Sequence, residues 1–323
     1  MSGSTGGRGR RRGRGRRGEQ PMVPDAEFTS YYGRPVLHAP TWRAPDIPGY
    51  LFLGGLAGAG SLLAAGAAVT GRPELAQVMK VGSLGAIGLG AVGLVHDLGR
   101  PSRFANMLRV FKPTSPMSVG SWLLAGYGPA AGVAALTALT GRAKTLGAVG
   151  TAAAAVLGPG VAAYTGALVS DTAVPAWHEG YREMPFLFVG SGASAAGGLG
   201  LLAVRLAESA PARSMAVLGT CLEMGATQVM ERRLGFVGTP YRSGSGGRFM
   251  TASKVLAAVG TAAALAGRRS RWMSAAAGAG FLASSACTRW GVFHAGLDSA
   301  RDPAYVVRPQ RERVQIGAQD DDR

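Results

Sequence analysis

The stretch LAQVMKVGSLGAIGLGAVGLVHDLGRPSRF, residues Leu75–Phe104, decides the fold of this chain. Its first part, Leu75–Val95, is apolar and long enough to cross a bilayer, which takes about 20 residues in a helix. The run ends in a polar cluster that includes His96, Asp97 and Arg100. Such groups can anchor a helix end among lipid headgroups, or they can bind a polar headgroup or a redox-linked proton.

Runs of the same kind recur on both sides of this stretch. The chain has 323 residues, of which 47% are hydrophobic and only 16% are charged. Lipid offers the backbone no hydrogen bonds, so spanning segments must be helical unless they alternate as barrel strands do, and these runs do not. The sequence predicts an all-α integral membrane protein, an eight-helix transmembrane bundle. The expected spans are Gly49–Thr70, Leu75–Val95, Val119–Thr140, Leu146–Ser170, Pro185–Ala207, Ser214–Met230, Met250–Gly267 and Trp272–Thr288.

Composition divides the chain into three parts. Residues 1–45 form a basic N-terminal arm and surface segment, 46–305 the transmembrane domain, and 306–323 a polar C-terminal tail. The beginning of the arm is almost only Arg and Gly, which cannot form a core, so we expect it to be disordered. An RNA-binding arm is one alternative. A basic arm held at the cytoplasmic membrane surface is the favoured one, with lipid and not nucleic acid as its partner.

Small residues spaced four apart predict where helices approach closely. Examples are Gly54 and Gly58 in the first span, and Ala196 and Gly200 in the fifth. The break Gly158-Pro159-Gly160 in the fourth span predicts a kink there.

The distribution of Lys and Arg predicts the orientation. On an eight-span topology, 24 of the 34 Lys and Arg residues lie on the side that holds both termini, and 8 lie on the other side. Cytoplasmic loops carry the excess of positive charge. We therefore expect a multi-pass protein of the inner or plasma membrane with both termini in the cytoplasm.

Charged residues inside spans are the sharpest chemical signal. Glu223 is the only acidic residue well inside a predicted span. A carboxylate there is costly and faces the bundle interior, either as a proton relay or as a protonated acid bonded to a neighbouring helix. Thr220 and Thr227 share its helical face. Lys80 lies near the start of its span, where its side chain can extend outward to the interface.

The chain's histidines are all expected on the face with the termini. These are His38, His96, His178 and His294. A quinone-headgroup site with proton exchange and an ordinary polar membrane surface are both compatible with this clustering. Because no histidine lies in mid-span and the two cysteines form no CxxC, we expect neither a metal site nor haem or an iron–sulfur cluster in this chain.

Three motifs carry a family resemblance. They are YLFLGGLAGAG at Tyr50–Gly60, HDLGRPSRF at His96–Phe104, and KPTSPMSVGSW at Lys112–Trp122. Together they resemble the NrfD/PsrC family, the membrane subunits of polysulfide-reductase-like complexes. Tyr164–Ser170 and Glu223 also fit this pattern, and the resemblance covers roughly residues 49–303.

The resemblance implies a membrane anchor that exchanges electrons between menaquinone or its quinol and a ferredoxin-like iron–sulfur subunit. That subunit serves a molybdopterin or tungstopterin catalytic subunit, and proton movement can accompany the electron transfer. NrfD-type subunits carry no haem or cluster of their own, and their quinone site lies near the face that meets the partner. The positions that match here are His96, Asp97 and Arg100 by motif, and His38, Tyr164 and His178 by neighbourhood.

The competing class is a non-redox membrane protein, either a transporter or a structural anchor. A transporter is expected to show an internal repeat and paired broken helices near the midplane. The sequence shows one clear break and no convincing repeat. The chain itself is thus expected to be a non-catalytic or quinone-reactive subunit of an oxidoreductase complex.

Overall fold

The computed structural model describes residues 37, 38, 40–97 and 106–320, with side chains described up to residue 312. Within these ranges the chain is helical and contains no strand. The Arg/Gly arm lies outside the described residues. The helices are α1 Asp46–Val69, α2 Pro73–Asp97, α4 Pro116–Thr140, α5 Lys144–Ser170, α6 Pro175–His178, α7 Met184–Ala203, α8 Ala210–Arg233, α9 Gly244–Ala266, α10 Arg271–Arg301 and α11 Ala304–Asp320, with 3-10 turns at Leu206–Glu208 and Thr239–Tyr241.

The prediction of a helical multi-pass membrane protein is confirmed, but the count of eight spans is not. Each predicted span corresponds to one long helix, yet only six of those described are apolar enough to cross a membrane: α1, α2, α4, α5, α7 and α9. The other two, α8 and α10, are just as long but carry charged residues along their length. The most deeply buried of these charged residues are Glu223 in α8 and Arg289 in α10.

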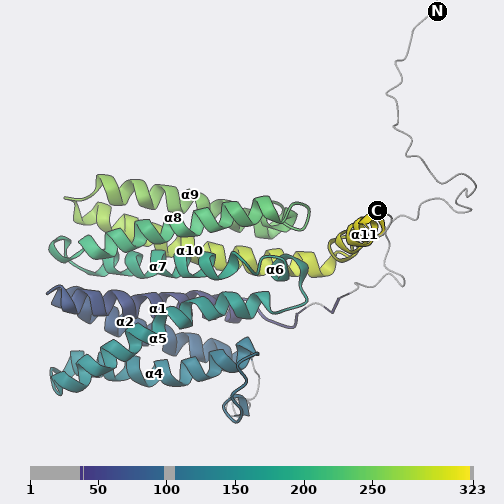
Figure 1. Cartoon of the computed structure of the whole chain (residues 1–323). Helices are drawn as coiled ribbons and strands as arrows, with labels where there is room; N and C mark the ends of the chain where they lie inside the picture. The colour runs from purple at the N-terminus through teal and green to yellow at the C-terminus, as the bar shows by residue number, and fades with distance from the viewer. Residues whose placement is uncertain (1–36, 39, 98–105, 321–323) are drawn as a thin grey trace, which may run out of the picture.

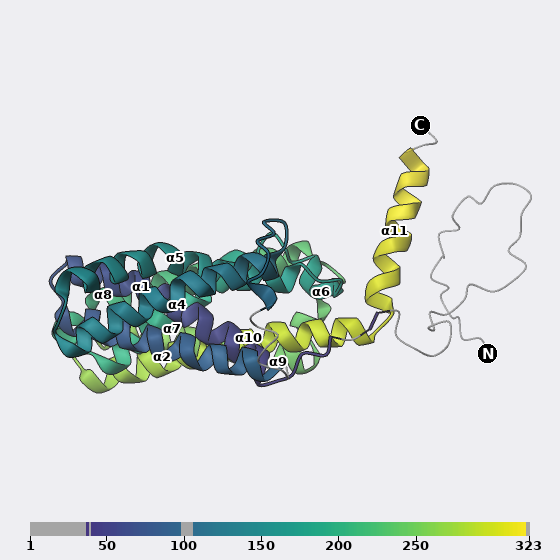
Figure 2. The ribbon, with the colours of Figure 1, turned by 90° about the horizontal axis from the view of Figure 1, so that it is seen from below.

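The long helices form two groups of four. Figure 1 shows α1, α2, α4 and α5 in one group and α7, α8, α9 and α10 in the other. Helix α7 packs against α1 and α5, and α1 also reaches α10, so these contacts join the groups. The start of α1, the end of α2, helix α6 and the end of α10 lie at one end of the bundle, which we name the α6 end. Helix α11 projects from it (Figure 2).

Small residues produce the closest helix contacts, as the spacing predicts. Gly58 of α1 lies directly against the backbone of Gly158 in α5, and a Cβ on either residue would overlap the other's carbonyl oxygen. Gly200 of α7 lies against α8, where an added Cβ would come within 2.6 Å of the Ala212 Cβ. Helix α5 runs as one helix through Pro159.

Two boundaries differ from the sequence prediction. The last span was expected to end at Thr288, but α10 continues to Arg301, so Arg289 and His294 lie inside a helix. The predicted span stops directly before Arg289, although apolar residues follow that arginine. The segment expected as a polar tail contains helix α11.

Candidate functional site

A small cavity lies between α1, α2, α4 and α5 near the α6 end. Its volume is about 100 Å³ and its walls are mostly apolar. Tyr50 of α1, Asp97 of α2, Ser121 of α4 and Tyr164 of α5 contribute polar groups, and Trp42 closes it from the segment before α1. The cavity therefore combines an apolar interior with a few convergent polar groups, as small-molecule sites do.

Tyr164 is placed by a glycine on the neighbouring helix. Its ring lies against Gly120 of α4, so closely that any side chain there would overlap it. Tyr164 is buried, as is Tyr50 on the facing helix α1. Glycine on α4 thus allows the Tyr164 ring to pack flat between the helices and to line the cavity.

Asp97 and His96 point in different directions although they are neighbours in sequence. Asp97 lines the cavity, and its Oδ1 accepts a hydrogen bond from the backbone N–H of Arg43 at 3.2 Å. The His96 Nδ1 lies 2.8 Å from Oδ2 of Asp46 at the start of α1, and its side chain is 70% exposed. Successive residues on a helix differ by about 100° in direction, so only one of the two can face the cavity.

The structure brings together only some of the residues predicted for the quinone site. Asp97 and Tyr164 meet in the cavity, whereas His38 is exposed on the segment before α1. His178 is exposed at the end of α6, with Nδ1 3.3 Å from the carbonyl oxygen of Ser170. Arg100 lies outside the described residues.

Trp42 is the cavity residue whose role the sequence did not indicate, because an aromatic residue before a span suggests only an interfacial position. Its ring stacks on that of Trp177 in α6, with ring centroids 5.4 Å apart. The Trp177 Nε1–H donates to the carbonyl oxygen of Val292 in α10 at 2.7 Å. Nearby, Tyr241 donates its hydroxyl proton to the Ala176 carbonyl oxygen at 2.9 Å, and burial raises the pKa of Tyr241 above its ordinary value.

A second polar site lies in the other helix group, around Glu223. This side chain is fully buried, and its Oε1 accepts a hydrogen bond from the Thr288 hydroxyl of α10. Thr220 and Thr227 are buried on the same face of α8, as predicted. Thr227 donates to the Glu223 carbonyl oxygen at 2.7 Å, and Thr220 pairs with Ser194 of α7 at 3.0 Å.

Arg289 is the residue that the sequence prediction missed at this site. It is fully buried on α10, where its Nη2 donates to the Phe188 carbonyl oxygen at 2.8 Å and its guanidinium lies 3.8 Å from the centre of the Phe188 ring. Glu223 is fully buried as well and bonds Thr288, the neighbour of Arg289 in α10, but the two charged side chains are not within the 4.0 Å of an ion pair. Nε and Nη1 of Arg289 and Oε2 of Glu223 have no hydrogen-bond partner in the described part of the chain.

Further buried hydroxyl groups adjoin the acid through Thr288. The Thr288 hydroxyl, which bonds Glu223, lies 2.7 Å from Oγ of Ser253 in α9. Ser253 in turn lies 3.1 Å from Oγ of Ser284. Hydroxyl groups both donate and accept, so this series of contacts can pass a proton between α8, α10 and α9.

The fold and these two sites define a class: a helical multi-pass membrane protein with a small, mostly apolar cavity near one end and a buried acid and a buried arginine in the bundle. The sequence profile of the polysulphide reductase NrfD family matches residues 40–234. The match covers more than half of the chain, and the protein belongs to this family, whose members are membrane subunits of oxidoreductase complexes. No individual curated protein matches the chain. The matched range includes the cavity and Glu223 but ends before Arg289.

Proposed function

We propose that this chain is the quinone-interacting membrane subunit of an oxidoreductase complex. In this proposal it passes electrons between menaquinone or its quinol and a ferredoxin-like iron–sulfur subunit, which serves a molybdopterin or tungstopterin catalytic subunit. The observation that carries the proposal is the meeting of Asp97 and Tyr164 in one apolar cavity. Membership of the NrfD family supports the same assignment.

The dimensions of the cavity suit a ring and not a whole lipid-soluble quinone. Its volume of about 100 Å³ is roughly three times the share of one water molecule in the liquid. Pockets for whole drug-sized ligands measure about 300–1,000 Å³. A headgroup would therefore lie between Tyr50 and Tyr164, with its tail outside among the helices. A quinone supplies two-electron, two-proton redox chemistry when it is bound there.

The residues of the chain then have distinct roles. The Tyr164 hydroxyl donates a hydrogen bond to a carbonyl oxygen of the headgroup, and the Asp97 carboxylate accepts one from a hydroxyl. His96, paired with Asp46 at the mouth, is exposed, so it is the proposed contact between the site and water. Burial of the aromatic walls excludes water from the ring and strengthens both hydrogen bonds.

The α6 end is the proposed docking face for the iron–sulfur subunit. It carries His38, His178 and the His96–Asp46 pair, and α11 projects from it. The excess of Lys and Arg supports an orientation in which this end faces the cytoplasm. Within the bundle, Glu223 is proposed to hold and release a proton coupled to quinone turnover, with the Arg289 cation nearby.

The test is binding of a fluorescent menaquinone analogue to the purified complex. Tyr164→Phe and Asp97→Asn each remove one hydrogen bond in a buried site, worth about 1–3 kcal/mol. We expect each to weaken binding about tenfold or more. Tyr181→Phe is the matched control, because Tyr181 is 50% exposed and does not line the cavity. Unchanged affinity in both cavity variants would remove the cavity as the quinone site.

The partner is tested separately, by purification from native membranes. Co-purification of iron–sulfur absorbance and a molybdopterin subunit supports the proposed complex. A colourless protein without partners favours a non-redox anchor. Cross-linking from Lys112 is expected to capture the iron–sulfur subunit, whereas cross-links formed only from Arg142, at the opposite end, contradict the proposed docking face.

A further inference from the structure

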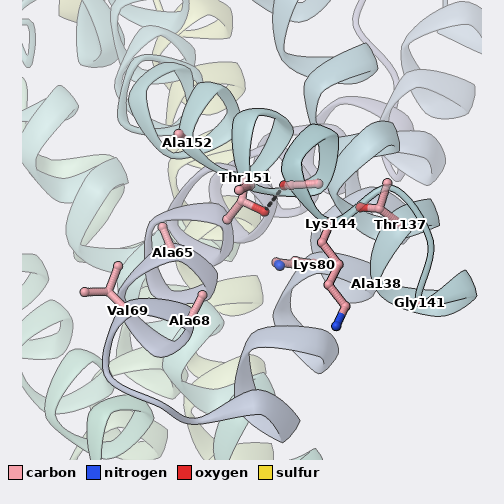
Figure 3. Close-up of a pocket in the computed structure, with 12 residues that line it drawn as sticks. Ala65, Ala68, Val69, Lys80, Thr137, Ala138, Gly141, Lys144, Thr151 and Ala152 are labelled. Carbon is pink, nitrogen blue, oxygen red and sulfur yellow. Dashed lines mark hydrogen bonds between the residues drawn. The ribbon is translucent and has the colours of Figure 1, made fainter.

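A groove lies at the end of the bundle opposite the α6 end, between the same four helices that form the cavity. Its volume is about 520 Å³. Two lysines enter it, Lys80 from α2 and Lys144 from the first residue of α5. Figure 3 shows both lysine side chains in this groove. None of the residues that line it is acidic.

The charges in the groove are uncompensated in the described part of the chain. No ion pair or hydrogen bond joins Lys80 or Lys144 to a residue described there. The two hydroxyls in the groove already donate to backbone carbonyls: Thr137 to Val133 and Thr151 to Gly147, each at 2.7 Å. Among the side chains that line the groove, the two lysine ammonium groups are thus the ones with protons still free to donate, and two like charges favour an anion as the incoming group.

Lys80 lies deeper than a lysine that merely marks a helix end. It lies about 10 Å along α2 from Pro73, at 1.5 Å per residue. Its side chain is partly buried, and burial without a counter-charge disfavours the ammonium form. An anion in the groove would offset that cost.

The walls of the groove show that the anion must also carry apolar chains. Ala65, Ala68 and Val69 of α1 form one wall, and Ala148 and Ala152 of α5 form another. Val69 is 88% exposed, so this apolar surface continues outward from the groove. A free inorganic anion would satisfy the lysines and leave these walls uncovered.

We propose that the groove binds an anionic phospholipid, with its phosphate between Lys80 and Lys144 and its acyl chains along the alanine walls. Basic pockets between transmembrane helices bind acidic lipid headgroups by the same combination of charge and apolar contact. The site lies at the opposite end of the bundle from the quinone cavity, so it does not depend on the proposed function.

The test is native mass spectrometry of the full-length protein, delipidated in detergent and titrated with phosphatidylglycerol, phosphatidylcholine or inorganic phosphate. We expect phosphatidylglycerol to bind about tenfold or more tightly than phosphatidylcholine. Lys80→Gln and Lys144→Gln should each remove most of this preference, because a charged hydrogen bond contributes about 1.5–3 kcal/mol. Lys80→Arg keeps the charge and should retain the preference. It therefore shows whether a loss of binding in Lys80→Gln comes from the missing charge or from misfolding. Arg269→Gln, an exposed change outside the groove, is the charge-matched control.

Three outcomes would overturn the proposal. The first is equal binding of the two lipids. The second is a preference for phosphatidylglycerol that survives both lysine variants. The third is displacement of phosphatidylglycerol by inorganic phosphate at a similar concentration, which would identify a free-anion site and not a lipid site.

Discussion

Replacing Arg289 with methionine removes the cation that lies beside Glu223 in the bundle interior. Methionine is long, unbranched and apolar, so it fills most of the space along the Phe188 ring. The change leaves the Glu223 carboxylate with the Thr288 hydroxyl as its hydrogen-bond partner. It also leaves the Phe188 carbonyl oxygen without its donor from Arg289.

The expected cost follows from full burial of both residues. Removing one of two opposite charges that are buried near each other destabilises a protein by up to about 3–5 kcal/mol, because the other charge remains uncompensated. Arg289→Met should lie at the lower end of this range, since a carboxylate can take up a proton and become neutral. Glu223→Gln should lie at the upper end, since a guanidinium cannot lose its charge as readily. The double variant buries no charge and should come within about 2 kcal/mol of the wild type.

The assay is a double-mutant cycle on the free energy of unfolding in mixed micelles at increasing denaturing detergent. The two single costs sum to about 8 kcal/mol and the double variant should cost about 2 kcal/mol, so we expect a coupling energy of about 6 kcal/mol between the two positions. Arg268→Met, an exposed change in the α9–α10 loop, should alter stability by less than about 0.5 kcal/mol. If the costs of the two single changes simply add in the double variant, Glu223 and Arg289 act independently and the pair does not exist.

Three further changes test the packing, the titration and the surface charge. Gly58→Val should destabilise the protein by about 1–3 kcal/mol in thermal unfolding, because the added side chain pushes α1 away from α5. Gly66→Val is the control, because a Cβ at that position meets nothing within 4 Å. The raised pKa of Tyr241 means that only the unfolded chain ionises it just above pH 10, so stability should fall by up to about 1.4 kcal/mol per pH unit there. Tyr241→Phe should be less stable at neutral pH, and its free energy of unfolding should fall less steeply above pH 10. Equal slopes for the variant and the wild type would contradict a raised pKa of Tyr241 in the folded protein. Arg233→Gln should cost about 1–2 kcal/mol in thermal unfolding, because its guanidinium bonds the Glu183 carboxylate at 2.6 and 2.7 Å, whereas Arg232→Gln should cost almost nothing.

The sequence predicted the helices well because lipid restricts the alternatives. A run such as Leu75–Val95 can cross a membrane only as a helix, and the structure has α2 there. The sequence predicted α8 and α10 less completely. A charged residue in an apolar run can mark the end of a span or lie inside the span with a partner, and the sequence alone does not distinguish the two. Glu223 was expected inside a span and is buried within α8, whereas the last expected span stopped before Arg289, which is buried within α10. The signal that would have found Arg289 is the acid itself, because a buried carboxylate needs a partner.

The candidate site could be predicted only in part, because a motif does not determine which way each side chain points. His96 and Asp97 are adjacent in the same motif, yet only Asp97 lines the cavity. Tyr164 joins it from a helix that lies far away in sequence, through packing against Gly120. Trp42 closes the cavity through its stacking on Trp177, which depends on how α6 lies against the segment before α1. These relations come from tertiary packing.

Helix α1 is the structural element that connects the two polar sites. Tyr50 on α1 lines the cavity, and Gly55 lies about 7.5 Å further along the same helix, at 1.5 Å per residue. A Cβ on Gly55 would stand 3.0 Å from Nη2 of Arg289, so the α1 backbone is in contact with the guanidinium. A headgroup that pressed on Tyr50 would thus act on the same rigid helix that sets the space available to Arg289. Coupling between the cavity and the Glu223–Arg289 pair therefore needs no continuous hydrogen-bonded path, because a small displacement of α1 reaches both.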